Sequence, residues 1–168
     1  MKRIITVIAA AAIMLSLCGC GENNESGGNA SDASVASSQA VKMSLADASE
    51  KVNNEVSFPS ETAEFTERRL KNMGIEAERM GAFAGRFCND AVNQEEYLFI
   101  TAKTDDDVQY IKEKLEARLQ SIYNVIKNYT PEQAAIIEKA TVDVNGKTVS
   151  LVISANADKI KETFKAAL

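Results

Sequence analysis

Histidine and tryptophan are both absent from the 168-residue chain, and the two absences narrow what it can do. A protein without histidine lacks the commonest general base and the commonest ligand for transition metals. A protein without tryptophan is a weaker candidate for stacking against sugars. The formal net charge is -5 and basic residues form no large cluster, so nucleic-acid binding is not expected. We therefore expect no metal site, no cofactor and no nucleic-acid partner.

Cysteine is also scarce, and two of the three cysteines, Cys18 and Cys20, follow an apolar N-terminal segment. Two cations, Lys2 and Arg3, precede an almost unbroken apolar run over residues 4–17. The run is about 14 residues long, which is shorter than the roughly 20 that a membrane-spanning helix needs. This order of charge and apolar run is typical of a secretory signal peptide. A buried or membrane-spanning helix is the alternative interpretation.

The four residues Leu17-Cys18-Gly19-Cys20 resemble the cleavage box of bacterial lipoproteins. In that box a small residue precedes the cysteine and an aliphatic residue stands three positions before it. We expect cleavage between Gly19 and Cys20 and a diacylglyceryl group, with acyl chains such as palmitate, on the Cys20 thiol. Cys18 fits less well as the lipid acceptor, because the bulky Leu17 precedes it. The expected location is the extracytoplasmic face of the cell membrane, where two or more acyl chains hold a protein durably.

Three segments follow from this interpretation. Residues 1–19 are the signal peptide, 20–42 are the lipidated cysteine with a flexible Ser/Gly/Asn-rich tether, and 43–168 are a single domain. The tether has too few large apolar residues to offset the entropy lost on ordering. The domain has about 126 residues, enough for one core. Its cysteine, Cys88, has no disulfide partner and no histidine to activate it, so we expect a small core residue.

Apolar periodicity and turn signals predict the elements of the domain. The first expected helix begins after a Ser44 cap. Further helices are expected over residues 61–73, 105–128 and 131–139, and Asn156 or Asp158 is expected to cap a last helix. The expected strands cover residues 79–89, with irregularities at Gly81 and Gly85, and 96–103, 140–145 and 147–155.

Three local signals refine these boundaries. Gly74 stands at the stop position of the second helix. Thr130 and Gln133 are expected to form a capping box around Pro131. Asn145-Gly146, between two alternating apolar runs, is the strongest short signal for a hairpin turn.

These elements define an α+β domain with an antiparallel sheet of about four strands, arranged as two ββα units, preceded by N-terminal helices. We expect the helices to pack on one face, leaving the other partly open to a partner. Residues 98–105 and 151–158 align with four identities. This similarity has two interpretations, a duplicated ββα unit or two independent solutions to the same strand-to-helix turn.

Candidate chemistry is sparse in the domain. The acidic run over residues 105–107 could bind a metal, but helix capping explains it without further assumption. The cations Arg68, Arg69 and Lys71 could bind an anion, but they also suit the C-terminal end of a helix dipole. We expect Lys114 and Arg118 to be exposed helix charges. Residues 95–96, two glutamates, have no identifiable acid–base partner, so we expect no catalytic residues.

Four segments carry a resemblance to a known family: EYLFITAK (96–103), IKEKLEARL (111–119), the break at Tyr129-Thr130-Pro131-Glu132, and VDVNGKTVSLVIS (142–154). Together they resemble a family of exported lipoproteins of Gram-positive bacteria that carries a domain of unknown function. The resemblance covers about residues 44–168 and supplies no catalytic residues.

The expected function is that of a membrane-anchored lipoprotein whose domain binds an envelope protein or a small ligand without catalysis. Two alternatives stay open. The domain could be an accessory or structural subunit of a cell-envelope complex, or a small hydrolase that uses carboxylates. The lack of histidine and of a paired nucleophile argues against the hydrolase.

Overall fold

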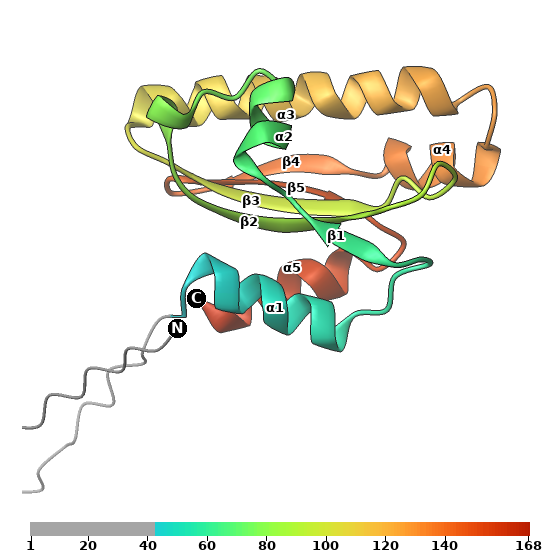
Figure 1. Cartoon of the computed structure of the whole chain (residues 1–168), viewed down its shortest axis with the longest axis horizontal. Coiled ribbons are helices and arrows are strands. Elements are labelled where there is room, and N and C mark those ends of the chain that lie inside the picture. Colours follow the sequence, from blue (N-terminus) through green and yellow to red (C-terminus); the bar gives the residue numbers. More distant parts are fainter. Residues whose placement is uncertain (1–42) are drawn as a thin grey trace, which may run out of the picture. The chain divides into compact units, whose positions relative to one another are not determined.

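The computed structural model of the protein describes residues 43–168, which form an α+β unit with a five-stranded antiparallel sheet (Figure 1). This confirms the predicted fold class. The helices are α1 (Leu45–Glu55), α2 (Glu67–Asn72), α3 (Asp105–Ile126), α4 (Pro131–Glu138) and α5 (Ala157–Ala167), with a short 3₁₀ turn η1 (Ala77–Arg79). The strands are β1 (Thr62–Glu64), β2 (Met80–Cys88), β3 (Glu96–Ala102), β4 (Thr141–Asn145) and β5 (Thr148–Ile153). None of these helices combines the length and apolar character that crossing a bilayer requires.

The sheet has the strand order β1-β2-β3-β5-β4. Two hairpins, β2–β3 and β4–β5, lie side by side because β3 pairs with β5, with Leu98 opposite Leu151. β3 is therefore the central strand. The short β1 pairs only with the end of β2, from Arg86 to Cys88, and forms one edge of the sheet.

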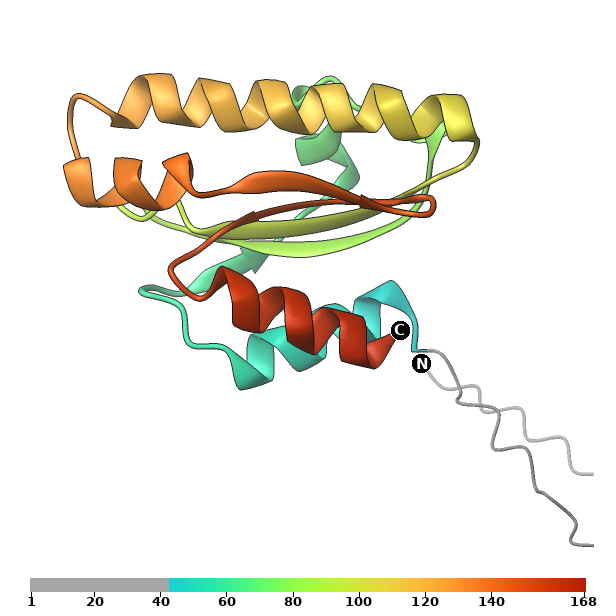
Figure 2. The same cartoon turned by 180° about the vertical axis from the view of Figure 1, so that it is seen from behind.

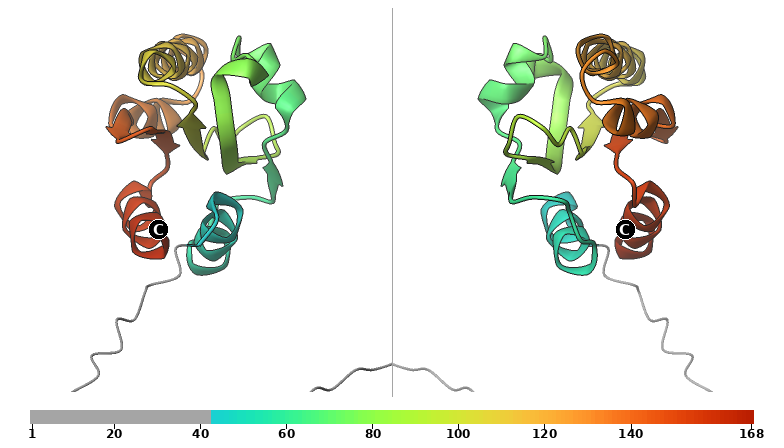
Figure 3. Two further views of the ribbon diagram at one scale, coloured as in Figure 1. Left: turned by 90° about the vertical axis from the view of Figure 1, so that its left-hand side faces the viewer. Right: turned by 90° about the vertical axis from the view of Figure 1, so that its right-hand side faces the viewer.

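Helices cover both faces of the sheet rather than the single face that we expected (Figures 1 and 2). Alternate residues of β3 explain this, because both sets are apolar. Leu98 and Ile100 join the larger core beneath α2, α3 and α4. Tyr97 and Phe99 join a second core beneath α1 and α5. Seen from the end of the sheet, α1 and α5 lie together on one side and α3 lies on the other (Figure 3).

The opposite placement of α3 and α5 bears on the internal similarity. The aligned residues Leu98 and Leu151 both face the larger core. The helix after β3 returns to that same face, whereas the helix after β5 crosses to the second core. The two ββα units therefore place their helices on opposite faces of the sheet although their aligned strand residues face the same core. This difference favours two independent solutions to a strand-to-helix turn over a duplicated unit.

Two local predictions were wrong in part. Residues 62–64 form β1 instead of the start of a helix, and α2 begins only after its Thr66 cap. The hairpin turn consists of Gly146 and Lys147, because Asn145 still pairs with Thr148. Gly146 has φ +56°, so the position that needs a glycine is the first residue of the turn.

The caps of the other helices agree with the sequence, except that the capping box predicted for Thr130 and Gln133 does not form. Ser44 and Asp47 form a capping box on α1, and Gly74, with φ +76°, follows α2 as expected. Thr130 is the N-cap of α4 and Pro131 opens it, but no side-chain hydrogen bond completes the box. Asn156, not Asp158, is the N-cap of α5.

The two glycines of β2 serve different purposes. A pairing irregularity lies between Met80 and Phe83, which places Gly81 at a bulge as predicted. Gly85 lies in regular pairing, yet a Cβ atom there would approach the Tyr97 carbonyl oxygen to 2.2 Å. Only glycine allows β2 and β3 to approach so closely at this point.

Candidate functional site

A polar cleft of about 420 Å³ lies where α2, the end of β2, the loop 89–95 and α3 meet. Its lining includes a guanidinium from α2, an aromatic ring and a thiol from β2, acids from the loop and β3, and a guanidinium from α3: Arg69, Phe87, Cys88, Asp90, Glu96 and Arg118. A larger hollow of about 530 Å³ lies between α1 and β2. Its arginine, Arg86, is already bound by Thr62 and Glu64, so the smaller cleft holds the richer chemistry.

An ion pair between Glu96 and Arg118 forms one wall of the cleft. Arg118 Nε donates to Glu96 Oε1 at 3.0 Å and its Nη2 donates to Oε2 at 2.7 Å, which is the two-point geometry of a strong pair. The Glu96 side chain is only 3% exposed and that of Arg118 is 23% exposed. Burial opposes the charge on Arg118, but its hydrogen bond to Glu96 and their attraction outweigh burial and raise the pKa of Arg118.

The Arg69 guanidinium forms a second wall and lies over the Phe87 ring, 3.5 Å from the ring centroid. Phe65 packs edge-on against Phe87, so the ring is fixed beneath the cation. Within residues 43–168, the buried Nε of Arg69 has no hydrogen-bond partner. Burial lowers the pKa of Arg69, repulsion from Arg118 lowers it further, and Glu96 partly offsets both.

The loop 89–95 forms the rim of the cleft and is closed by Asp90. One Asp90 oxygen accepts from the backbone N–H groups of Val92 and Asn93, both at 2.7 Å. The other oxygen accepts from the Asn93 side chain at 2.9 Å. These hydrogen bonds, led by that from Asn93, hold the pKa of Asp90 well below its usual range. The loop is tied to α4, since Gln94 N–H donates to Gln133 Oε1 at 3.0 Å.

The remaining reactive groups are occupied. Cys88 is 6% exposed, as predicted for a core residue, and burial raises the pKa of its thiol. Glu95 accepts a hydrogen bond from Ser154 Oγ, which in turn accepts from Asn156 N–H at the start of α5. A thiol held protonated and carboxylates that already have partners form no nucleophile–base pair.

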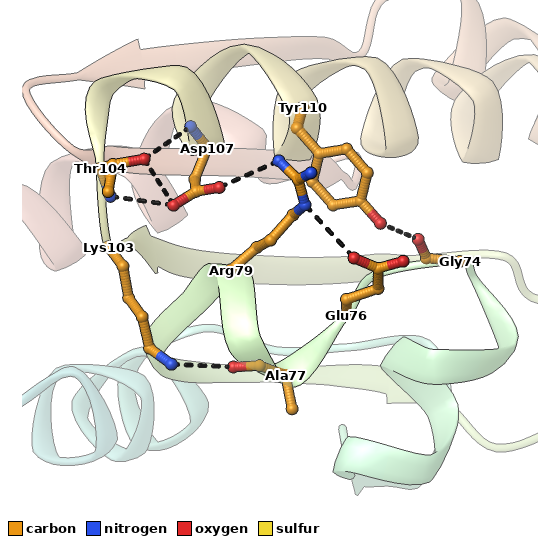
Figure 4. A network of polar contacts seen from close by, with 8 residues as sticks. All are labelled: Gly74, Glu76, Ala77, Arg79, Lys103, Thr104, Asp107 and Tyr110. Carbon is orange, nitrogen blue, oxygen red and sulfur yellow. Dashed lines mark hydrogen bonds and ion pairs between the residues drawn. The ribbon is translucent and has the colours of Figure 1, made fainter.

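A second polar cluster lies at the start of α3 and is structural (Figure 4). Arg79 donates to Glu76 and Asp107 and stacks on the Tyr110 ring, 4.4 Å from its centroid. Asp107 also completes a capping box with Thr104. These contacts join η1 to the first turn of α3 and leave the oxygens of Asp107 engaged.

The candidate residues of the sequence analysis differ in where they lie and in which partners they have. The acidic run 105–107 opens α3, as capping requires, and residues 43–168 contain no cluster of acids and cysteine suited to a metal. The prediction that Arg118 is an exposed charge was wrong, because its side chain is mostly covered and pairs with the buried Glu96. Glu95 and Glu96 both have partners that sequence reasoning missed. Gly19 and Cys20 lie outside the described residues.

One signal could have indicated the cleft. Glu96 opens the most apolar strand of the chain, and Arg118 lies three residues after Leu115 in the apolar stripe of α3. A charged residue in each of two buried faces suggests a pair, although the sequence alone does not say that the two faces meet.

The chain thus folds into an α+β domain with a polar, charge-lined cleft between α2, β2, the loop 89–95 and α3. Residues 54–154 match the family model described as Domain of unknown function (DUF4358), and the chain belongs to that family. The matched segment contains every strand and all the cleft residues named above, whereas α5 and most of α1 lie outside it. No curated protein and no solved structure matches the chain.

Proposed function

We propose that the protein is a lipoprotein of the bacterial cell envelope, anchored through Cys20, whose DUF4358 domain is a non-catalytic binding module. The observation that carries the anchoring is the sequence Leu17-Cys18-Gly19-Cys20 after a charged start and a short apolar run. We also propose, from the resemblance of residues 44–168 to exported lipoproteins, that the protein comes from a Gram-positive bacterium. Loss of the two cations in the leader would take the formal charge from -5 to -7. Because an acidic protein is not attracted to an anionic membrane surface, the lipid and not charge would hold the protein at the membrane.

The lipid anchor has sufficient strength for this role. Each buried methylene contributes about 0.8 kcal/mol, so one acyl chain binds only marginally and two bind stably. A diacylglyceryl group on Cys20 supplies two chains. Residues 21–42 would then separate the anchor from the folded domain.

The proposal of a binding module is supported by the cleft at Arg69 and Arg118. It combines two guanidinium groups, an aromatic floor and a rim closed by an Asp90 turn. No nucleophile with an adjacent base is assembled in it, which makes the carboxylate hydrolase the weaker candidate. An accessory subunit of an envelope complex is the alternative within the same location.

Replacement of Cys20 by alanine tests the anchor. We expect the Cys20→Ala variant, expressed in a bacterium, to leave the detergent phase in a phase-partition assay and to lose incorporation of labelled palmitate. Cys18→Ala is the matched control, because it removes a neighbouring thiol and leaves the acceptor in place. Continued palmitate labelling of Cys20→Ala, or its loss in Cys18→Ala, would overturn the assignment of Cys20.

A further inference from the structure

The acids around the cleft already have their charges compensated. Both oxygens of Glu96 are held by Arg118. Both oxygens of Asp90 are held within the loop 89–95. Glu95 is bound by Ser154 on the side of α5. The acidic lining therefore offers no free carboxylate for binding a cation, and its charge does not extend freely into the cleft.

Arg69 differs from these groups because its charge is not compensated by a direct partner. In the part of the chain that the structure describes, no hydrogen bond or ion pair reaches its guanidinium, and its Nε is buried without an acceptor. Stacking on Phe87 at 3.5 Å fixes the plane of the cation and leaves the edge of the guanidinium for hydrogen bonding. A partly buried cation held in this way is a preorganised donor for an anion.

The chemistry of the surroundings selects the class of anion. A planar guanidinium matches a carboxylate through two parallel hydrogen bonds. A doubly charged group such as phosphate is matched less well than a carboxylate, because only one cation of the cleft, Arg69, is uncompensated. The volume of about 420 Å³ lies in the range of roughly 300–1,000 Å³ that small-molecule sites occupy.

We infer that the cleft binds a small organic acid and that Arg69 receives its single carboxylate, with the Phe87 ring beneath the guanidinium and the Glu96–Arg118 pair beside it. This inference rests on the proposed function of the domain as a binding module. The pair has a positioning role, since it holds a second cation close to Arg69 while its own charge is balanced.

Nuclear magnetic resonance of the full chain, labelled with ¹⁵N and solubilised in a neutral detergent, tests the inference. The Nε–H signals of Arg69 and Arg68 are followed during titration with sodium acetate, inorganic phosphate or uncharged acetamide at constant ionic strength. Arg68 is an exposed residue on the same helix and serves as the internal control. We expect acetate to shift the Arg69 signal in a saturable manner, and we expect acetamide and phosphate to leave it near its starting position.

Two variants extend the test. Arg69→Gln is expected to weaken acetate binding at least about tenfold, whereas Arg68→Gln leaves it unchanged, since a hydrogen bond to a charged group accounts for such a ratio. Equal acetate shifts at Arg68 and Arg69 overturn the site, and stronger binding of phosphate overturns the carboxylate class. The comparison of the Arg68 and Arg69 signals in the native protein tests the carboxylate site even where Arg69→Gln fails to fold. Release of Cys20→Ala from the membrane is independent of these signals, so failure here rejects the carboxylate site alone.

Discussion

Arg118 shows how one residue can stand at the boundary between core and surface. Its neighbours in the apolar stripe of α3, Leu115 and Ile122, are buried, and its own side chain is mostly covered. The long stem of arginine allows its methylene groups to pack while the guanidinium reaches a partner. That partner is Glu96, which would otherwise be a buried carboxylate without compensation.

Removing Arg118 alone should therefore be costly. We expect Arg118→Met to lower the free energy of unfolding by about 3 kcal/mol, because it leaves the Glu96 charge buried and unpaired. The double variant Arg118→Met with Glu96→Met should be clearly more stable than the sum of the single changes predicts. Urea unfolding of the four proteins measures this coupling.

The exposed pair Lys112–Glu116 on the same helix provides the control for that cycle. Its atoms are 3.6 Å apart, and both side chains are more than a third exposed. A cycle on this pair should give no more than about 0.5 kcal/mol. Similar coupling energies for the two pairs would contradict the role assigned to burial.

At the residue scale, the sequence predicted most of what depends on neighbours along the chain. The Ser44 cap and the capping acids of α3 follow from residues within one turn. The pair Glu96–Arg118 joins residues 22 positions apart, and the Arg69 stack on Phe87 joins α2 to β2. Such contacts depend on which faces meet, which local spacing does not encode.

At the scale of elements, the long and strongly patterned segments were predicted best. The bounds of α3, Asp105–Ile126, lie within two residues of the expected 105–128. The weakest prediction was residues 61–73, where β1 precedes α2. A strand of three residues has too few positions to show alternation, and β1 is stabilised by pairing with β2 and by Arg86 bonds to Thr62 and Glu64.

The contact between β2 and β3 gives the prediction at this scale. A methyl group at Gly85 would overlap the Tyr97 carbonyl oxygen at 2.2 Å and the Leu98 Cα at 2.8 Å, and both are backbone atoms that cannot rotate away. We expect Gly85→Ala to lower the free energy of unfolding by about 3 kcal/mol, as overpacking does. Gly81→Ala is the matched control, because its nearest contact would be an ordinary 3.5 Å. Comparable losses in the two variants, measured in urea, would refute this account.

The sheet as a whole is more enclosed than its composition suggested. Antiparallel sheets often expose one face, and this led to the expectation of helices on one side. β3 is apolar at both odd and even positions, however, and reads as a strand that is buried on both faces. That pattern is visible in the sequence and indicates a second covering layer, which α1 and α5 form in the structure.

The response of the whole molecule to pH follows from groups in both layers. Hydrogen bonds from Thr104 and the Arg79 charge hold the pKa of Asp107 below its usual value, and those of the loop 89–95 do the same for Asp90. Folding is therefore stabilised above the ordinary carboxyl pKa of about 4, and this contribution is lost as the pH falls. Burial raises the pKa of Tyr97, whose hydroxyl donates to the Ser49 carbonyl oxygen at 2.9 Å. That contribution is lost as the pH rises above about 10.

We therefore expect the urea midpoint to be nearly constant between about pH 5 and pH 8 and to fall on either side. The Cys88 thiol, whose pKa burial also raises, contributes to the alkaline fall. Asp107→Asn should flatten the acid limb, whereas Asp106→Asn, at an exposed neighbour in the same turn, should leave it unchanged. Tyr97→Phe should reduce the loss of stability above about pH 10, because the phenol can no longer ionise when the chain unfolds. An acid limb of equal steepness in wild type and Asp107→Asn would show that the Thr104–Asp107–Arg79 contacts do not couple folding to protonation.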